Sequence, residues 1–266
     1  IRDLVRSRGL GDVYKRQTLS CIPVLLVGIA AYHLYTNFII NMTEKSSIET
    51  IDLVCDDIDS LLNDAWNLCD MLTGDIKMQK YLRMDFDSVR DQYSNDLAGS
   101  MELASISTYR KDIFGVYVFG QNGGRYKSNY YSFKSEDQRE TTWYKAIAGS
   151  RETTWFPSHE GSFIVRSSIS DNFITVGQPV MDKASGMVNG IVAADIKEDV
   201  ITQKIKHSLS NGVICIIDQE GSILFRSNAG NDLHYPIDIS PSLVSHILES
   251  TGTAVGKSMV VPDSGY

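Results

Sequence analysis

Residues 173–196 read FITVGQPVMDKASGMVNGIVAADI, and this stretch decides the fold. Two apolar runs rich in β-branched residues, 173–181 and 187–196, flank the turn sequence DKASG and predict two successive strands. Upstream, SFIVRSSIS (162–170) and TTWF (153–156) predict two more strands, and TTWYKAIAG (141–149) predicts a short helix. The region is therefore expected to form an antiparallel sheet with a helix packed against it.

A hairpin precedes the short helix. The alternating run IFGVYVFG (113–120), the tight-turn sequence QNGG (121–124) and the run RYKSNYY (125–131) predict it. Downstream, EDVITQKIKHSL (198–209) predicts a connecting helix and GVICIIDQEGSILFRSN (212–228) a second hairpin, followed by a helix at 241–250 and a strand within 253–261. The expected fold is α+β, with two tandem PAS-like antiparallel sheets and flanking helices, the second sheet incomplete at Tyr266.

An apolar segment, TLSCIPVLLVGIAAYHLYTNFII (18–40), contains no Asp, Glu, Lys or Arg and is long enough to cross a bilayer core as a helix. A signal peptide would have a shorter apolar region and a small-residue cleavage site, so we expect a retained transmembrane helix, with a buried core helix as the other alternative. The preceding basic tail contains RSRGLGDVYKRQ, which resembles a translated adaptor sequence; a genuine tail would lie in the cytoplasm.

A long amphipathic helix is expected after the membrane segment. From Asn41 onward, apolar residues recur at steps of three and four without a proline, which predicts a stalk that packs on its own domain and on a partner subunit. The stripe consists of Ile48, Ile51, Val54, Cys55, Ile58, Leu61, Leu62, Ala65, Leu68, Cys69 and Leu72. A break near 73–75 and a second helix at about 87–109 follow, and we expect a homodimer through the stalk.

The expected organisation has five parts. They are a basic tail of possible adaptor origin (1–17), a transmembrane helix (18–40), the stalk with the second helix (41–110), a membrane-distal module (111–205) and a truncated membrane-proximal module (206–266).

Composition excludes several classes of function. The 266-residue chain has a formal charge of −8 and no Lys/Arg cluster beyond residue 17, which argues against a nucleic-acid partner. Its four cysteines and five histidines show no zinc-ligand spacing, and the sequence has no HExxH, no GxSxG and no phosphate-binding loop. We therefore expect no metal, no cofactor and no enzymatic activity in this chain.

Several short motifs resemble the double-Cache (dCACHE) family of bacterial extracytoplasmic sensor regions. They are WYKA (143–146), Trp155, QPV (178–180) with Asp182 and Gly186, GIVAADI (190–196), and IIDQEGSILFRS (216–227) for the second module. The resemblance covers roughly residues 18–266. It implies a distal module that binds a small molecule, a proximal module that couples it to the membrane, and a plasma-membrane location with the sensor outside the cytoplasm.

By the same resemblance, Trp143, Tyr144 and Asp195 would touch the ligand. Amino-acid-binding members of the family place an Arg two residues before the Trp and a Tyr-x-Asp shortly after it. Here Arg139 stands four residues before Trp143, and the later stretch reads WFP (155–157). The sequence thus departs from the amino-acid-binding pattern, and the ligand class stays open.

A pocket for a small polar metabolite needs aromatic walls and a few fixed charges. The residues expected to bind the ligand are Tyr117, Tyr131, Trp143, Tyr144, Trp155, Arg166 and Asp195. Asp195 ends an apolar strand, where its carboxylate needs a ligand, a partner or water; it can equally cap the helix near Glu198. Trp143 also suits a core position, Arg166 can point outward from its strand, and Tyr131 can lie on the surface.

The expected function is small-molecule sensing by the input region of a bacterial transmembrane receptor. A histidine kinase is favoured as the cytoplasmic output, ahead of a chemoreceptor or a diguanylate cyclase. The alternative is a membrane-anchored ectodomain that binds a protein or the cell wall without a small-molecule ligand.

Overall fold

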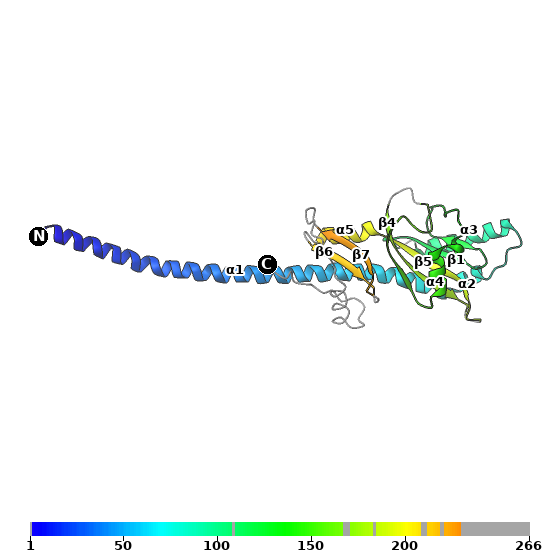
Figure 1. Ribbon diagram of the computed structural model, residues 1–266, viewed down its shortest axis with the longest axis horizontal. Helices are drawn as coiled ribbons and strands as arrows, with labels where there is room; N and C mark the ends of the chain where they lie inside the picture. Colours follow the sequence, from blue (N-terminus) through cyan, green and yellow to red (C-terminus); the bar gives the residue numbers. More distant parts are fainter. Residues whose placement is uncertain are drawn as a thin grey trace. The chain divides into compact units, whose positions relative to one another are not determined.

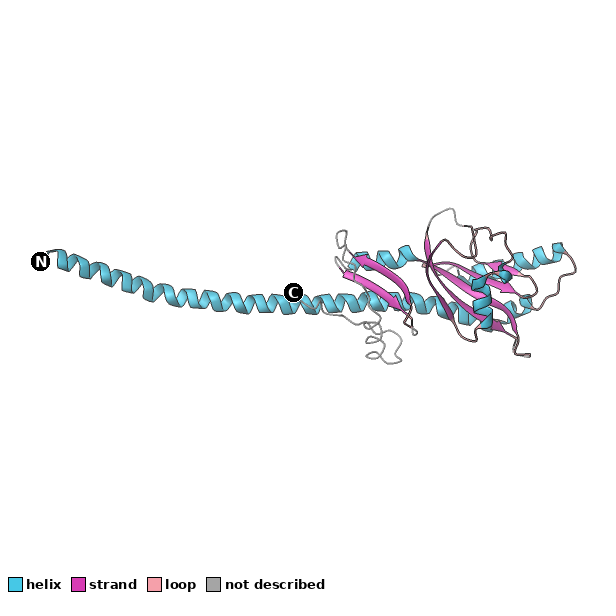
Figure 2. Ribbon diagram, viewed as in Figure 1, coloured by secondary structure: helices cyan, strands magenta, loops and turns pink. Residues whose placement is uncertain are grey.

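The structure is a computed structural model that describes residues 2–107, 110–166, 171–182, 185–208, 212–218 and 221–229 (Figures 1 and 2). Helix α1 runs from Arg2 to Gly74. The chain divides into two units, Ile1–Thr50 and Ile51–Tyr266. The sheets all belong to the second unit.

The first unit carries the apolar segment that the sequence predicts to cross a membrane. Among the described residues, one helix is long and apolar enough for such a span by length and composition. Its best 18-residue window has a mean hydropathy of 1.6, and none of that window is buried. The helix continues unbroken into the predicted stalk and ends at Gly74, next to the predicted break.

A five-stranded antiparallel sheet forms the centre of the second unit. Its strands are β1 (Ile113–Gly120), β2 (Arg125–Lys127), β3 (Thr154–Glu160), β4 (Asn172–Met181) and β5 (Val188–Lys197). Their order is β2-β1-β5-β4-β3, so the strand that comes last in sequence lies in the middle, between β1 and β4 (Figure 1). The predicted hairpin of β1 and β2 is confirmed, although β2 is shorter than the expected 125–131.

Helices occupy the connections. They are α2 (Ile76–Leu82), α3 (Val89–Ser107), the 3-10 turn η1 (Gln138–Glu140), α4 (Thr142–Gly149) and α5 (Glu198–Ser208). The sequence pattern did not predict α2, which begins after Asp75, whose side chain accepts a hydrogen bond from the Met78 amide.

The second sheet follows α5 and pairs β6 (Gly212–Ile217) with β7 (Ile223–Ala229). The long N-terminal helix, the antiparallel sheet with flanking helices and this second small sheet confirm the predicted α+β fold. The helix expected at 241–250 and the strand expected within 253–261 lie outside the described residues.

The five-stranded sheet is covered on both faces. On one face, which we call the α1 face, the apolar stripe of α1 packs against the sheet with seven buried residues, Val54, Ile58, Leu61, Ala65, Leu68, Cys69 and Leu72. On the other, the α4 face, α4 lies against β4 and β5. There, Gly177 allows close packing, because a Cβ at this position would lie 2.3 Å from the Ile147 Cδ1 atom.

The buried residues of α1 show that the stalk stripe packs on its own domain, as predicted.

One predicted strand is not formed. The stretch 162–170 was expected to be a strand, but its described residues 162–166 form a turn with a single isolated bridge between Val165 and Phe133. The reason lies in Ser162, whose hydroxyl accepts hydrogen bonds from the amides of Ile164 and Val165 and so competes with a sheet ladder. We call residues 161–166 the Ser162 turn.

Candidate ligand site on the α4 face

The sheet register gathers polar side chains on the α4 face. Thr175 of β4 lies directly opposite Asp195 of β5, and Tyr117 of β1 lies opposite Ala193, two residues before Asp195. Because side chains at i and i+2 of a strand share a face, Thr175, Tyr117 and Asp195 project to the same side. All three are buried.

Asp195 is fully buried and is held by hydroxyl groups of its own chain. Ser162 Oγ donates to its Oδ2 atom at 2.6 Å and Thr175 Oγ1 to its Oδ1 atom at 2.6 Å, while the Tyr117 hydroxyl also bonds the carboxyl. Burial raises the pKa of Asp195 to about 6, against the opposing effect of these hydrogen bonds. The sequence left open that Asp195 caps the helix near Glu198 or faces water. Its carboxylate does neither.

His159 joins the same cluster from β3, and no motif in the sequence marked it. Its Nδ1 atom lies 2.8 Å from the Gly161 carbonyl oxygen and its Nε2 atom 3.0 Å from Thr175 Oγ1. Its ring stacks on Phe163 of the Ser162 turn, with the ring centres 3.6 Å apart. Burial lowers the pKa of His159, with a smaller contribution in the same direction from Lys134.

A β-bulge explains why His159 reaches this face. Trp155 and His159 are four residues apart, so in a regular strand they would share a face, yet Trp155 packs in the core of the α1 face. The register of β3 against β4 shifts between Phe156 and His159, which reverses the alternation. Pro157 lies within this bulge on an edge strand, where its missing N–H is tolerated.

Helix α4 supplies two adjacent aromatic side chains to the α4 face. Trp143 is 6% exposed and Tyr144 2% exposed. Phe119 meets both rings, with centres 5.8 and 6.5 Å away, and Phe163 stacks on Trp143. Among the described residues, neither the Trp143 Nε1 atom nor the Tyr144 hydroxyl has a hydrogen-bond partner. Burial raises the pKa of Tyr144 to about 12, so the hydroxyl stays protonated and available as a donor.

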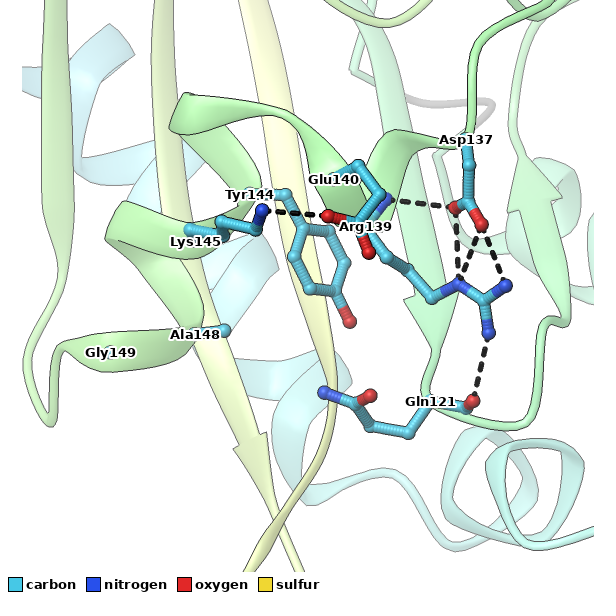
Figure 3. A pocket seen from close by; sticks show the side chains of 8 residues that line it. All are labelled: Gln121, Asp137, Arg139, Glu140, Tyr144, Lys145, Ala148 and Gly149. Carbon is cyan, nitrogen blue, oxygen red and sulfur yellow. Dashed lines mark hydrogen bonds and ion pairs between the residues drawn. The ribbon is translucent and has the colours of Figure 1, made fainter.

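A pocket of about 560 Å³ opens beside Tyr144 (Figure 3). It is lined by Gln121, Asp137, Arg139, Glu140, Tyr144, Lys145, Ala148 and Gly149. Two ion pairs, Arg139 with Asp137 at 2.7 Å and Lys145 with Glu140 at 2.7 Å, balance the charges at its rim. Arg139 also donates to the Gln121 carbonyl oxygen at 3.2 Å. The pocket is therefore polar, neutral in sum and adjacent to an aromatic side chain with a free donor.

The structure brings together five of the seven residues that the sequence selected. Tyr117, Trp143, Tyr144 and Asp195 are buried on the α4 face, and Tyr131 packs at its edge with its ring centre 5.0 Å from that of Phe114. Trp155 instead lies on the α1 face. Arg166 is exposed at the end of the Ser162 turn, because the strand expected to orient it is not formed.

Sequence reasoning missed Ser162, Thr175 and His159. Ser162 and Thr175 have uncharged side chains within apolar runs, which gives no signal, and His159 depends on the bulge. Only the placement of Asp195 at the end of an apolar strand indicated that polar partners must exist nearby.

No family model matches the chain. The sequence is 22% identical over 242 residues to the methyl-accepting chemotaxis protein McpA of Pseudomonas putida, a match that covers 89% of this chain and 35% of that protein. The chain thus spans about a third of the length of this curated relative. The relative is a receptor protein, which agrees with the prediction that this chain is not an enzyme.

Solved structures with a similar arrangement are ligand-binding domains of bacterial chemoreceptors. The domain of Campylobacter jejuni Tlp3 in complex with L-valine has a TM-score of 0.48 and 16% identity, and the match covers 77% of this chain and 80% of that one. The domain of Pseudomonas aeruginosa PctC in complex with GABA has a TM-score of 0.44 and 17% identity, with 65% and 70% covered. The curated relative is a chemotaxis protein, so the histidine kinase favoured from the sequence finds no support in it.

Proposed function

We propose that this chain is the extracytoplasmic input region of a membrane-bound chemoreceptor, and that its five-stranded sheet binds a small polar metabolite on the α4 face. The curated relative is a chemotaxis protein, which supports a chemoreceptor output over the histidine kinase that the sequence favoured. An apolar helix followed by a sensor sheet is the arrangement that such a receptor needs. The same sensor could serve a kinase, so the output is settled by the cytoplasmic part of the receptor.

The observation that carries the proposal is the pair of unpartnered donors on α4. Leaving a buried donor without a hydrogen bond costs roughly 1–3 kcal/mol. Two such donors lie on neighbouring residues, Trp143 Nε1 and Tyr144 OH, whereas the other unpartnered buried side-chain atoms of the described residues, Asn95 Oδ1 and Gln138 Oε1, are acceptors. A ligand that presents acceptor atoms to them would offset this cost, and Tyr144 itself lines the pocket.

The chemistry of the α4 face favours a ligand with both an acceptor group and an amine. Carbonyl or carboxylate oxygens match the donors of α4. A protonated amine matches the buried carboxylate of Asp195, which has three hydroxyl donors and can accept a further hydrogen bond. Aromatic rings from Tyr117, Trp143 and Phe163 would enclose the apolar part of such a molecule.

A thermal-shift screen tests the proposal. The 266-residue chain in detergent is heated with single metabolites, beginning with L-valine and GABA, which similar domains bind, and continuing with other amines and organic acids. A ligand present at 100 times its Kd would stabilise the chain by about 2.7 kcal/mol. For a domain of this size we expect Tm to rise by roughly 5–10 °C, saturably with concentration.

Three variants locate the effect. Tyr144→Phe and Trp143→Phe each remove one unpartnered donor. Without ligand we expect an unchanged or slightly higher Tm for Tyr144→Phe and a lower Tm for Trp143→Phe, because the smaller ring leaves a cavity, and both should lose much of the ligand-induced shift. Tyr130→Phe is the matched control, because that side chain is fully exposed. If no metabolite stabilises the chain while a cell-wall fragment or a protein does, the proposal fails and the alternative ectodomain function takes its place.

A further inference from the structure

Three polar side chains form a continuous hydrogen-bonded row from β3 to β5. His159 Nε2 lies 3.0 Å from Thr175 Oγ1, and Thr175 Oγ1 lies 2.6 Å from Asp195 Oδ1. Thr175 and Asp195 are fully buried, so water cannot replace either contact. At its other end, the imidazole is fixed by the contact of Nδ1 with the Gly161 carbonyl oxygen.

Counting protons along this row restricts the charge states. A carbonyl oxygen only accepts, so Nδ1 must carry a proton. If Asp195 is ionised, the single hydroxyl proton of Thr175 is donated to the carboxylate, and Thr175 Oγ1 can then only accept from His159. Nε2 must in that case also carry a proton, which makes His159 a cation.

A second arrangement satisfies the same contacts without any charge. If Asp195 is protonated on Oδ1, it donates to Thr175 Oγ1, and Thr175 donates to a neutral His159 at Nε2. The two arrangements differ only by the transfer of one proton across the Thr175 hydroxyl. Removing that proton leaves Thr175 with two acceptors and one hydrogen, which breaks a contact. Adding another makes both neighbours donors, which Thr175 Oγ1 can accept while its own hydrogen is left without an acceptor in the row.

Among the described residues, Lys134, Tyr117 and Cys69 are further titratable groups that act on this row or are acted on by it. Lys134, in the segment before η1, lowers the pKa of both His159 and Asp195 through its positive charge. On β1, Tyr117 bonds Asp195, and burial together with the carboxylate raises its pKa well above the ordinary value, so it stays protonated. Across the sheet, Cys69 of α1 also has a raised pKa, from burial first and from Asp195 second, and stays neutral. His159 and Asp195 are thus the two groups of this row between which a proton can move.

We propose that His159, Thr175 and Asp195 act as a relay that holds one shared proton, with His159 as the positioning residue that decides whether Asp195 is an anion. The ligand-related part of this inference rests on the proposed function. When the proton resides on His159, Asp195 is an anion that attracts the ammonium group of a ligand. When it resides on Asp195, the carboxyl is neutral and gives no such attraction, so binding of an amine is coupled to the position of the proton.

Nuclear magnetic resonance of histidine side chains tests the relay without any ligand. The full chain in detergent, with ¹⁵N- and ¹³C-labelled histidine, is titrated from acidic to basic pH, and the His159 signal is assigned by its loss in His159→Gln. In the wild type we expect Nδ1 of His159 to carry a proton throughout the titration, both in the cation below the midpoint and in the neutral ring above it. In Asp195→Asn the amide resembles the neutral carboxyl, so the midpoint of His159 should fall by about one pH unit or more.

Substitutions of Thr175 separate the relay from simple packing. Thr175→Ser keeps the hydroxyl and should retain the wild-type midpoint, whereas Thr175→Val fills the same space without a hydroxyl and should lower it. Equal midpoints in the wild type and in Asp195→Asn, or in Thr175→Ser and Thr175→Val, would overturn the relay. If a variant does not fold, the wild-type signal alone decides, because a neutral His159 that carries its proton on Nε2 contradicts the proton count.

This outcome is independent of the ligand screen. A relay that titrates as expected, in a chain that no metabolite stabilises, would leave the inference on the proton intact and remove the proposed function. If a metabolite stabilises the chain but the midpoint of His159 does not depend on Asp195, the proposed function stands and the relay is overturned.

Discussion

Gly190 of the central strand β5 lies opposite Gly120 of β1. A Cβ at this position would lie 2.2 Å from the carbonyl oxygen of Phe119, a backbone atom that cannot rotate away as a side chain would. We expect Gly190→Ala to reduce the free energy of unfolding by about 1–3 kcal/mol, the usual range for overpacking a core. Urea-induced unfolding of the chain in detergent, followed by tryptophan fluorescence, measures the loss.

Gly74 provides the matched control for that substitution. It is the last residue of α1, and nothing lies within 4 Å of a Cβ built there. Gly74→Ala should change the free energy of unfolding by less than about 0.5 kcal/mol. If both variants lost the same stability, the close approach of β1 and β5 would not be the cause.

At the scale of single residues, the sequence could predict a site residue only where a local sequence pattern marked it. Asp195 was found because a carboxylate that ends an apolar strand needs a partner. His159 could not be found, since its face depends on a bulge, and a shift by one residue moves every later side chain to the other side of the sheet. Trp155, selected from the sequence as an aromatic wall of the ligand site, precedes this bulge and lies on the α1 face.

At the scale of elements, one hydroxyl links the Ser162 turn to the central strand β5. Ser162 Oγ donates to Asp195 and accepts from the amides of Ile164 and Val165. We expect Ser162→Ala to cost about 1.5–3 kcal/mol of stability, because a hydrogen bond to a buried carboxyl is lost. Hydrogen exchange at the two amides should accelerate and report the release of the turn.

Ser150→Ala is the control for this turn. Ser150 Oγ also bonds backbone groups, donating to the Glu152 carbonyl and accepting from its amide, but in a solvent-exposed turn. Its removal should have an effect within about 0.5 kcal/mol. Unchanged exchange at Ile164 and Val165 in Ser162→Ala would show that other contacts hold the turn.

Elements that consist of long patterned runs were predicted correctly, and those fixed by distant partners were not. β4 and β5 are continuous apolar runs on either side of a turn, and α4 ends at a glycine, so each carries its own signal. The stretch 162–166 has the composition of a strand, but Ser162 is bound by Asp195, 33 residues further along the chain. Local periodicity contains no information about a contact of that kind.

For the molecule as a whole, the two units should be separable. Among the residues that the structure describes, the buried side chains of the core come from residues 54–225, whereas the apolar residues from Leu19 to Ile40 are largely exposed. We expect a chain that begins at Asn41 to be soluble without detergent and to melt within a few degrees of the full chain in detergent. Differential scanning fluorimetry measures both transitions.

A shorter chain that begins at Asp75 serves as the contrasting variant. It lacks the seven α1 residues that cover one face of the sheet, so we expect it to lose the cooperative transition. Aggregation of the Asn41 chain would contradict the separation of the units. The predicted homodimer through the stalk stays a prediction, since much of the stalk stripe is used inside the subunit, and sedimentation of the Asn41 chain would measure it.

The position of β5 has a consequence for the order in which the protein can form. The ribosome makes β1 and β4 before β5, yet in the sheet these two strands meet only through β5. Until Lys197 has been synthesised, the hairpin of β1 and β2 and the pair of β3 and β4 are separate fragments with open edges. The nascent chain therefore has to keep two unfinished sheet pieces apart from other chains, and the strand that carries Asp195 joins them last.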